Sequence, residues 1–283
     1  MAQAKAVQES LSIDLGDRVA VVFGAGSVAP GWSNGRASAV AYARCGARVA
    51  CIDLDRGKAE ETAGIVDDAG GPALPLQADV LDFEQVCSVV DTITAEWGRI
   101  DILHNNVGGA AGGDVTEITI ADWTGDIEIN LGSAFRTCKA VLPTMLEQSA
   151  GVITNISSIL AVAVGRHPAP AYGAGKAGLE QFTRFLASRY AANGIRANAI
   201  RPGLLETPLV YSGLDPVADA DAIRHLKEER DATSPTGKMG NAWHVAETAA
   251  FLASDAASYI NGAVLPVDGG LGCRLSEARS VNA

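Results

Sequence analysis

The sequence lacks the features that mark metalloproteins, disulfide-stabilised domains and membrane proteins. It has only four histidines, His104, His167, His225 and His244. Their spacing is not that of metal ligands, so we expect no metal site. The five cysteines are odd in number and scattered without a Cys-x-x-Cys pair, which favours free thiols in a reducing cytoplasm. No apolar run reaches the roughly 18 residues that a membrane span requires.

Positive charge is also scarce. The chain has 22 lysines and arginines against 33 aspartates and glutamates, a net charge of −11 that disfavours a nucleic-acid partner. Residues 1–14 do not show the charged-then-apolar pattern of a signal peptide, so we expect a flexible tail there and a cytoplasmic location. The 283 residues, 48% hydrophobic and 19% charged, suffice for one large α/β domain or two small ones.

Short apolar runs alternate with amphipathic stretches along the chain. The runs predict strands over 18–23, 47–52, 73–77, 101–105, 151–156, 195–200 and 263–267. The stretches between them predict helices over 36–45, 58–69, 83–97, 122–148, 172–192 and 243–252. Asp82 is the expected N-cap of the third helix, and Pro143 is a point where the fourth can kink. This alternation predicts an α/β fold, a doubly wound, Rossmann-like parallel sheet of about seven strands with helices on both faces.

Ligands of such sheets bind at the carboxyl ends of the strands. The first strand is followed by GAGSVAPGWSNGR (24–36), where glycines let the backbone approach a pyrophosphate at the start of the next helix, although a glycine-rich surface loop would look the same. Asp53 follows the second strand, where a carboxylate can accept the hydroxyls of an adenosine ribose and repel a 2′-phosphate. Asp79 and Val80 follow the third strand, and NNVGG (105–109) follows the fourth. Together these strand ends predict a lined cleft.

A tyrosine and a lysine four residues apart open the helix predicted after the fifth strand. In YGAGK (172–176) the phenol and the ammonium lie on one face of the helix, one turn apart. An unperturbed tyrosine titrates near ~10, and a nearby cation should lower this pKa enough for general acid/base catalysis, although the same spacing also occurs in surface pairs. Ser158 ends the fifth strand and can hydrogen-bond a substrate oxygen. Its surroundings lack the Gly-x-Ser-x-Gly elbow of a serine nucleophile.

In this order the motifs resemble those of the short-chain dehydrogenase/reductase family, in its compact single-domain form. The resemblance extends from Leu15 to Gly272. Asn105 to Gly108 match the family's Asn-Asn-Ala-Gly, with Val107 in place of alanine, and the catalytic residues are matched by Asn130, Ser158, Tyr172 and Lys176. Arg196, Asn198, Pro202 and Gly203 match Arg-x-Asn-x-x-x-Pro-Gly, and Thr207 and Pro208 follow them. Asp268 to Gly270 match the closing Asp-Gly-Gly.

The resemblance implies an NAD(H)-dependent oxidoreductase that interconverts a secondary alcohol and a ketone by hydride transfer. Tyr172 would be the general acid/base, Lys176 would bind the nicotinamide ribose and lower the tyrosine pKa, and Ser158 would hold the substrate oxygen. Asn130 would hold a water that links Lys176 to solvent, and these four residues form the expected catalytic set. Thr207 would contact the nicotinamide carboxamide. The expected NAD contacts are Gly24, Asn34, Gly35, Asp53, Leu54, Asp79, Val80, Asn106, Gly108, Tyr172, Lys176, Pro202, Gly203 and Thr207.

The residues expected to line the substrate pocket are mostly apolar, which favours a hydrophobic, cyclic or aromatic alcohol or ketone. They are Gly109, Leu160, His167, Leu204, Leu205, Leu209 and Tyr211. Residues 204–242 form a longer excursion than the sheet needs, and we expect a substrate lid whose apolar start faces the pocket and whose charged helix, near 218–230, faces water. The single domain would then cover 15–272, with a C-terminal tail over 273–283.

The chain departs from the family pattern in its glycine-rich loop. Gly24 and Gly35 are eleven positions apart instead of six, a five-residue insertion, and Phe23 replaces the usual threonine or serine. Which amides of 26–33 contact phosphate therefore stays open. We expect the amides of Asn34 and Gly35, at the start of the helix, to face the pyrophosphate.

The sequence leaves three other interpretations open: a non-catalytic nucleotide-binding sensor with the same fold, an enoyl reductase and a sugar-nucleotide epimerase. The complete set of catalytic residues argues against the sensor. Enoyl reductases resemble this family but usually space tyrosine and lysine more widely, and epimerases usually have a larger region after the position of Gly203. The family is often tetrameric, so we expect a homotetramer acting on a small molecule, without a nucleic-acid or membrane partner. The sequence does not identify the substrate, its stereochemistry or the physiological direction.

Overall fold

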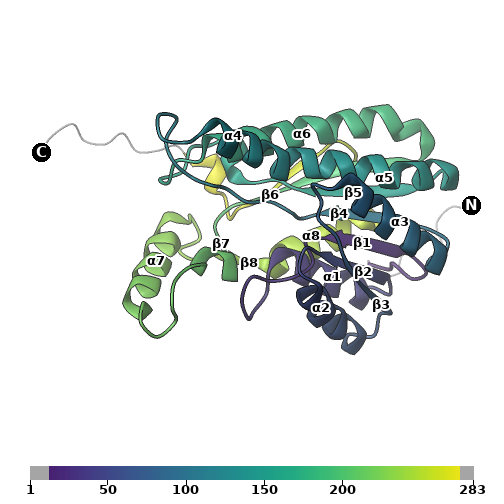
Figure 1. The fold of residues 1–283 in the computed structure, drawn as a ribbon, viewed down its shortest axis with the longest axis horizontal. Helices are drawn as coiled ribbons and strands as arrows, with labels where there is room; N and C mark the ends of the chain where they lie inside the picture. The colour runs from purple at the N-terminus through teal and green to yellow at the C-terminus, as the bar shows by residue number, and fades with distance from the viewer. Residues whose placement is uncertain (1–12, 275–283) are drawn as a thin grey trace, which may run out of the picture.

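A parallel sheet of seven strands lies at the centre of the molecule (Figure 1). The computed structural model describes residues 13–274, and within them the strand order is β3-β2-β1-β4-β5-β6-β9. The strands are β1 (Val19–Phe23), β2 (Arg48–Asp53), β3 (Ala73–Gln77), β4 (Ile102–Asn105), β5 (Gly151–Ile156), β6 (Ile195–Pro202) and β9 (Val264–Val267). The chain order reverses between β1 and β4, which is where doubly wound sheets bind their ligands. The predicted fold class is confirmed.

Helices cover both faces of the sheet (Figure 1). One face carries α1 (Asn34–Arg44), α2 (Arg56–Asp68) and α8 (Ala242–Ala253), and the other carries α3 (Phe83–Trp97), α4 (Ile120–Ile127), α5 (Ser133–Gln148) and α6 (Pro170–Tyr190). Each face has its own apolar core, because parallel strands between two helical layers are buried on both sides. Within residues 13–274 no helix has both the length and the apolar character needed to cross a membrane.

The two ends of the described chain lie close to the expected limits of the domain. Leu15 is fully buried, and its backbone amide donates to the carbonyl oxygen of Cys45 at 2.7 Å. At the other end, Leu271–Cys273 form a short 3-10 turn. The tails expected over 1–14 and 273–283 fall largely outside the described residues.

Most elements form close to their predicted bounds, because the period of their apolar residues decides their type. β3, α3 and β5 have the predicted bounds, and Asp82 caps α3 by accepting two backbone amides of its first turn. The helix predicted over 122–148 is different. A π-helical turn, Glu128–Gly132, separates α4 from α5, and α5 then continues through Pro143 to its end.

A small second sheet follows the end of β6. β7 (Leu205–Glu206) and β8 (Gly240–Asn241) pair in parallel, and the sequence did not predict them because two-residue strands leave no periodic pattern. Between them lies α7 (Ala220–Thr233), which stands apart from the main layers in Figure 1 and has no buried residue. The Lys227 ammonium lies 2.6 Å from the Glu206 carboxylate, so an ion pair connects α7 to β7.

The first helix approaches the first strand closely at two glycines. A Cβ added at Gly35, the second residue of α1, would lie 1.9 Å from the carbonyl oxygen of Gly24. Gly24 itself has a φ of +79°, a left-handed conformation that favours glycine. This contact places the start of α1 directly against the carboxyl end of β1.

We predict that Gly35→Ala destabilises the fold by about 1–3 kcal/mol or more, because the added methyl group meets backbone atoms that cannot rotate away. Gly64→Ala is the matched control. Gly64 lies in α2, and a Cβ there meets no atom within 4 Å, so better helix propensity should leave the stability unchanged or raise it by up to about 1 kcal/mol. Urea denaturation measures both variants, and a Gly35→Ala protein as stable as the wild type would contradict the close approach.

Candidate active site

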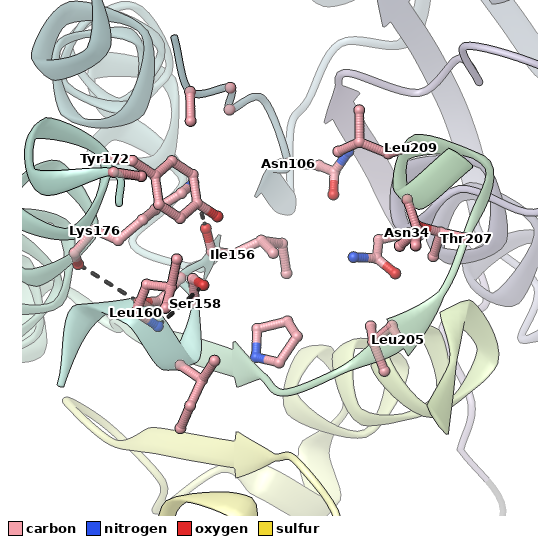
Figure 2. A pocket seen from close by; sticks show the side chains of 18 of the residues that line it. Asn34, Asn106, Ile156, Ser158, Leu160, Tyr172, Lys176, Leu205, Thr207 and Leu209 are labelled. Carbon is pink, nitrogen blue, oxygen red and sulfur yellow. Dashed lines mark hydrogen bonds between the residues drawn. The ribbon is translucent and has the colours of Figure 1, made fainter. Parts of the chain in front are cut away.

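A cavity of about 1160 Å³ lies at the carboxyl ends of the central strands (Figure 2). Its wall is made by the residues that end or follow β1 to β6, together with parts of α6 and α7. Pockets for a single small molecule are commonly about 300–1,000 Å³, so this cavity has room for a dinucleotide and a substrate. It occupies the position predicted for the cleft.

Most of the predicted site residues line this cavity. From the cofactor set they are Gly24, Asn34, Asp53, Leu54, Asp79, Val80, Asn106, Gly108, Tyr172, Lys176, Pro202, Gly203 and Thr207. From the substrate set they are Gly109, Leu160, His167, Leu204, Leu205 and Leu209, and Ser158 lines the wall as well. Three predicted residues are not part of the wall: Gly35 packs against Gly24, Asn130 lies behind Gly108, and the Tyr211 hydroxyl is directed to Glu206 at 3.4 Å.

The loop after β1 forms a cradle that fits a dinucleotide. A Cβ at Gly26 would lie 2.7 Å from Oδ2 of Asp53, so only glycine fits where the loop passes the end of β2. Asn34, the first residue of α1, extends its side chain into the cavity (Figure 2), and its Oδ1 is buried without a hydrogen-bond partner among the described residues. A helix N-terminus and an unpaired carboxamide beside a glycine-bounded space fit a polar, phosphate-bearing cofactor.

The inserted residues of this loop form a bulge that leaves the cavity wall over 29–32. The Ser33 hydroxyl closes the bulge by donating to the carbonyl oxygen of Gly26 at 2.7 Å. Trp32 packs against Trp243 at the start of α8, with ring centroids 4.8 Å apart. The insertion therefore lengthens the loop without entering the space between Gly26 and the start of α1.

Asp53, the last residue of β2, presents its carboxylate to the cavity. Oδ2 accepts the amide of Gly26 at 2.9 Å and Oδ1 accepts the amide of Asp55 at 3.1 Å, which fixes the orientation of the side chain. The cations at the start of α2 pair elsewhere: Arg56 with a glutamate of its own helix at 2.8 Å, and Lys58 with Asp55 at 3.9 Å. A carboxylate held in this way favours ribose hydroxyls and disfavours a phosphate.

Ser158, Tyr172 and Lys176 meet on one side of the cavity (Figure 2). Ser158 follows β5 in an extended conformation. Tyr172 lies in the first turn of α6, and Lys176 follows one turn later with Nζ 5.8 Å from the centroid of the tyrosine ring. The ammonium donates to the carbonyl oxygens of Ile156 at 2.9 Å and Val107 at 3.5 Å. A hydroxyl, a phenol and an ammonium thus face one space.

Burial changes the pKa of both titratable groups. It raises the pKa of Tyr172 above its ordinary value, and the hydrogen bond with Ser158 opposes this shift without cancelling it. It lowers the pKa of Lys176 to about 8. The expected lowering of the tyrosine pKa by Lys176 is not seen here, because the ammonium faces backbone carbonyls and desolvation of the phenol is the larger effect.

The π-helical turn between α4 and α5 places Asn130 behind Gly108, close to Lys176. Its Nδ2 donates to the carbonyl oxygens of Gly109 at 2.6 Å and Asp126 at 2.8 Å, and its Oδ1 accepts the amide of Gly109 at 3.3 Å. A Cβ at Gly108 would lie 2.7 Å from this Oδ1 and 2.9 Å from Nζ of Lys176. Asn130 and Lys176 therefore approach each other across a position where only glycine fits.

A buried ion pair between Glu180 and Arg201 lies beneath the site and was not predicted from the sequence. Glu180 accepts both Nε and Nη2 of Arg201, at 2.7 and 2.6 Å, and also the Ser157 hydroxyl at 2.8 Å. These contacts connect α6 to the ends of β5 and β6, next to Ser158. The only sequence signal is a glutamate on the buried face of α6, which periodicity alone does not pair with a distant arginine.

One face of α7 also lines the cavity, through Leu226, Glu229, Arg230 and Thr233. Their spacing of three and four residues is that of one helical face. The expectation that the charged part of this helix faces water holds for Glu229, which is exposed, but not for Arg230, which is half-buried on the cavity wall. An ion pair between Glu229 and Arg166 joins α7 to the loop that precedes α6.

Comparison with known proteins identifies the family. A family model described as enoyl-(acyl carrier protein) reductase matches residues 28–272. Cis-4-hydroxycyclohexanecarboxylate dehydrogenase of Sinomonas cyclohexanicum is 41% identical over 255 residues, which cover 90% of this chain and 96% of that protein. D-threitol dehydrogenase of Mycolicibacterium smegmatis is 37% identical over 271 residues, covering 95% and 98%. The crystal structure of a short-chain type dehydrogenase/reductase from Mycobacterium marinum matches with a TM-score of 0.82 at 28% identity, covering 93% and 98%.

The chain belongs to the short-chain dehydrogenase/reductase family. It is an oxidoreductase of the kind that acts on alcohol and ketone substrates with a nicotinamide cofactor. The cavity, the glycine-bounded loop and the group of Ser158, Tyr172 and Lys176 are consistent with this membership.

We predict that alcohol oxidation accelerates as the pH rises above neutral and that ketone reduction slows over the same range. If Tyr172 is the general base, oxidation needs its ionised form, and since burial raises its pKa, the ionised fraction grows only toward alkaline pH. Reduction needs the protonated form, which is lost over the same interval. Initial rates of NADH formation and consumption across this range measure both directions.

Tyr172→Phe is the control for this prediction. It keeps the ring but lacks the hydroxyl, so turnover should fall by roughly 10²–10⁴-fold while NADH binding, followed by fluorescence, is retained. The assignment of Tyr172 is refuted by a variant with near wild-type turnover, or by a wild-type enzyme that oxidises alcohols fastest in acid.

Proposed function

We propose that the protein is an NAD(H)-dependent dehydrogenase that interconverts a secondary alcohol and a ketone, with Asn130, Ser158, Tyr172 and Lys176 as its catalytic residues. The observation that carries this proposal is the convergence of Ser158, Tyr172 and Lys176 on one side of the cavity that also contains the glycine-rich loop and Asp53. Groups arranged in this way can hold a carbonyl oxygen and exchange a proton with it.

In the proposed mechanism these side chains act on the substrate oxygen and its proton. NAD, when bound, supplies the hydride chemistry. Ser158 hydrogen-bonds the substrate oxygen, and Tyr172 removes the hydroxyl proton in oxidation or returns it in reduction. Lys176, with a pKa of about 8, passes the proton toward Asn130 and solvent.

We propose a hydrophobic or cyclic substrate. Leu160, Leu204, Leu205 and Leu209 give the substrate end of the cavity an apolar wall, which favours a hydrocarbon body. The relatives named above include one that acts on a cyclohexanecarboxylate, and 3beta-hydroxysteroid dehydrogenase 1 of Eggerthella lenta is 37% identical over 250 residues. D-threitol dehydrogenase, named for a polyol, is also 37% identical to this chain. The apolar wall of this cavity favours the hydrophobic or cyclic substrate over a polyol.

An enoyl reductase is the second candidate, because the matching family model has that description. We favour the alcohol dehydrogenase. Tyr172 and Lys176 lie one helical turn apart on one face of α6, whereas enoyl reductases usually space these residues more widely. The complete set of polar catalytic groups likewise disfavours a non-catalytic sensor.

We also propose that residues 15–272 act as one domain, with 204–242 as a lid over the substrate. The lid begins with Leu204 and Leu205 on the cavity wall and continues to α7, whose face toward the cavity is described above. One face of α7 is exposed, and two surface ion pairs connect this helix to Glu206 and Arg166. These ion pairs can break without loss of the core.

We propose a homotetramer, as is frequent in this family, and exposed aromatic residues on neighbouring helices support contact with a second copy. Phe135 on α5 is 52% exposed and Phe185 on α6 is 56% exposed. Phe182 extends this patch, with its ring centroid 6.3 Å from that of Phe135. An apolar patch on two long helices is typical of a surface that contacts a second copy.

A panel of secondary alcohols tests the proposed activity. We expect NADH to form with cyclohexanol or a substituted cyclohexanol, and to be consumed with the matching cyclohexanone, because the cavity wall is apolar beside the catalytic group. A 2-enoyl thioester serves as the control for the second candidate. Reduction of the enoyl thioester without any turnover of alcohols or ketones would replace the proposal with an enoyl reductase.

We predict a preference for NAD(H) over NADP(H), set by Asp53. Its carboxylate accepts hydroxyl groups and repels a 2′-phosphate, so Asp53→Asn should lower the ratio of kcat/KM for NAD to that for NADP by roughly 10-fold or more, as expected for a charged hydrogen bond. Asp55→Asn is the matched control. Asp55 caps α2, and since asparagine caps a helix about as well as aspartate, this variant should keep both its stability and its cofactor choice. Equal efficiency of the wild type with both cofactors would overturn the assignment.

A further inference from the structure

The substrate end of the cavity collects positive charge in a protein that is strongly acidic overall. Four basic side chains line this end of the wall: Arg166, His167, Arg230 and Arg274. Glu229 is the one carboxylate beside them, since the other acidic residues of the wall, Asp53 and Asp79, lie at the ends of β2 and β3. With a net charge of −11 on the chain, this gathering of three arginines runs against the general charge of the protein.

Arg230 differs from the other cations of α7. Lys227 pairs with Glu206 at 2.6 Å, and Arg224 pairs with Asp221 at 2.9 Å on the solvent side. Among residues 13–274, no carboxylate lies within ion-pair distance of Arg230. Its one side-chain hydrogen bond there runs from Nε to the sulfur of Met239 at 3.2 Å.

The surroundings of Arg230 leave its charge without a matched partner. The side chain is half-buried, and this partial removal from water lowers its pKa. The neighbouring carboxylate of Glu229 is bound to Arg166. A guanidinium has five N–H donors in a planar fork, and only one of these has an acceptor in the described part of the protein. The remaining donors lie on a residue of the cavity wall.

We propose that Arg230 binds a carboxylate of the substrate, so that the substrate class is a hydroxy acid and its oxo acid with an apolar, cyclic body. This inference rests on the proposed function. The hydroxyl carbon would lie against Ser158, which follows β5, and Tyr172 in α6. The carboxylate would meet α7 on another wall and form a bidentate pair with the guanidinium. The reaction leaves the carboxylate unchanged: Tyr172 takes the hydroxyl proton, and NAD, when bound, would supply the acceptor for the hydride, so that the hydroxy acid becomes its oxo acid.

The substrate carboxylate would also explain how the lid recognises its ligand. Arg230 lies on the same helical face as Leu226 and Thr233, so an anion bound there holds this face against the cavity. A neutral alcohol of the same shape offers α7 only apolar contact. Acids should therefore bind more tightly than neutral analogues, and the difference should depend on Arg230.

Calorimetry on the enzyme–NADH complex tests this, with cyclohexanecarboxylate and its neutral analogue cyclohexanecarboxamide as probes. We expect the wild type to bind the acid roughly 10- to 100-fold more tightly than the amide, the range that a charge-assisted hydrogen bond provides. Arg230→Gln should abolish this difference, and Arg230→Lys should keep part of it. Arg224→Gln is the matched control, since Arg224 lies on the solvent side of α7 and should leave the difference unchanged.

Several outcomes would overturn the inference: equal affinity of the wild type for acid and amide, no measurable binding of either, or an acid preference that survives in Arg230→Gln. Thermal unfolding of each variant shows whether α7 and the fold are retained. An enzyme that oxidises neutral cyclohexanol as efficiently as hydroxy acids would keep the proposed function and lose the carboxylate site. If no alcohol reduces NAD, the proposed function fails, while the calorimetric comparison still decides whether Arg230 binds an anion.

Discussion

Lys176 carries its ammonium group into the interior of the protein, where the residue is 2% exposed and Nζ lies 2.9 Å from the carbonyl oxygen of Ile156. Burying a charge is unfavourable unless hydrogen bonds replace those of water, and here the carbonyls that follow β4 and end β5 supply them. The same contacts fix α6 on the sheet and so hold Tyr172, one turn earlier, at the cavity. The position of the phenol, the pKa of the lysine and the need for glycine at 108 all depend on this one buried cation.

The cavity has two ends of opposite charge, and each is built from segments that are distant in the chain. At the cofactor end, the carboxylate of Asp53 is held by the glycine-rich loop and the start of α2. At the substrate end, the arginines come from the loop before α6, from α7 and from the residues after β9. A ligand with a hydroxyl-rich, uncharged ribose at one end and an anion at the other matches this distribution.

The fold could be predicted because its signal is spread over many residues: seven apolar runs, the helices between them and the strand-end motifs that place the catalytic group. Features decided by packing could not. The π-helical turn Glu128–Gly132 keeps helical periodicity on both sides, and the pair of Glu180 and Arg201 joins residues far apart in sequence. The direction of the Tyr172 pKa shift depends on burial, which the spacing to a lysine does not reveal. Arg230 lies in a charge-rich helix of the kind that usually faces water, and only the position of α7 places it on the cavity wall.

The central claim is that this cavity transfers a hydride directly between nicotinamide and the carbon of a substrate carbonyl, with the proton handled separately by Tyr172. Reduction of a cyclic ketone with NADH that carries deuterium on the transferred position of the nicotinamide ring tests this directly. We expect the deuterium on the carbinol carbon of the product, which mass spectrometry and proton NMR can show. Deuterium lost to water, or found on a carbon next to the carbonyl, would contradict it.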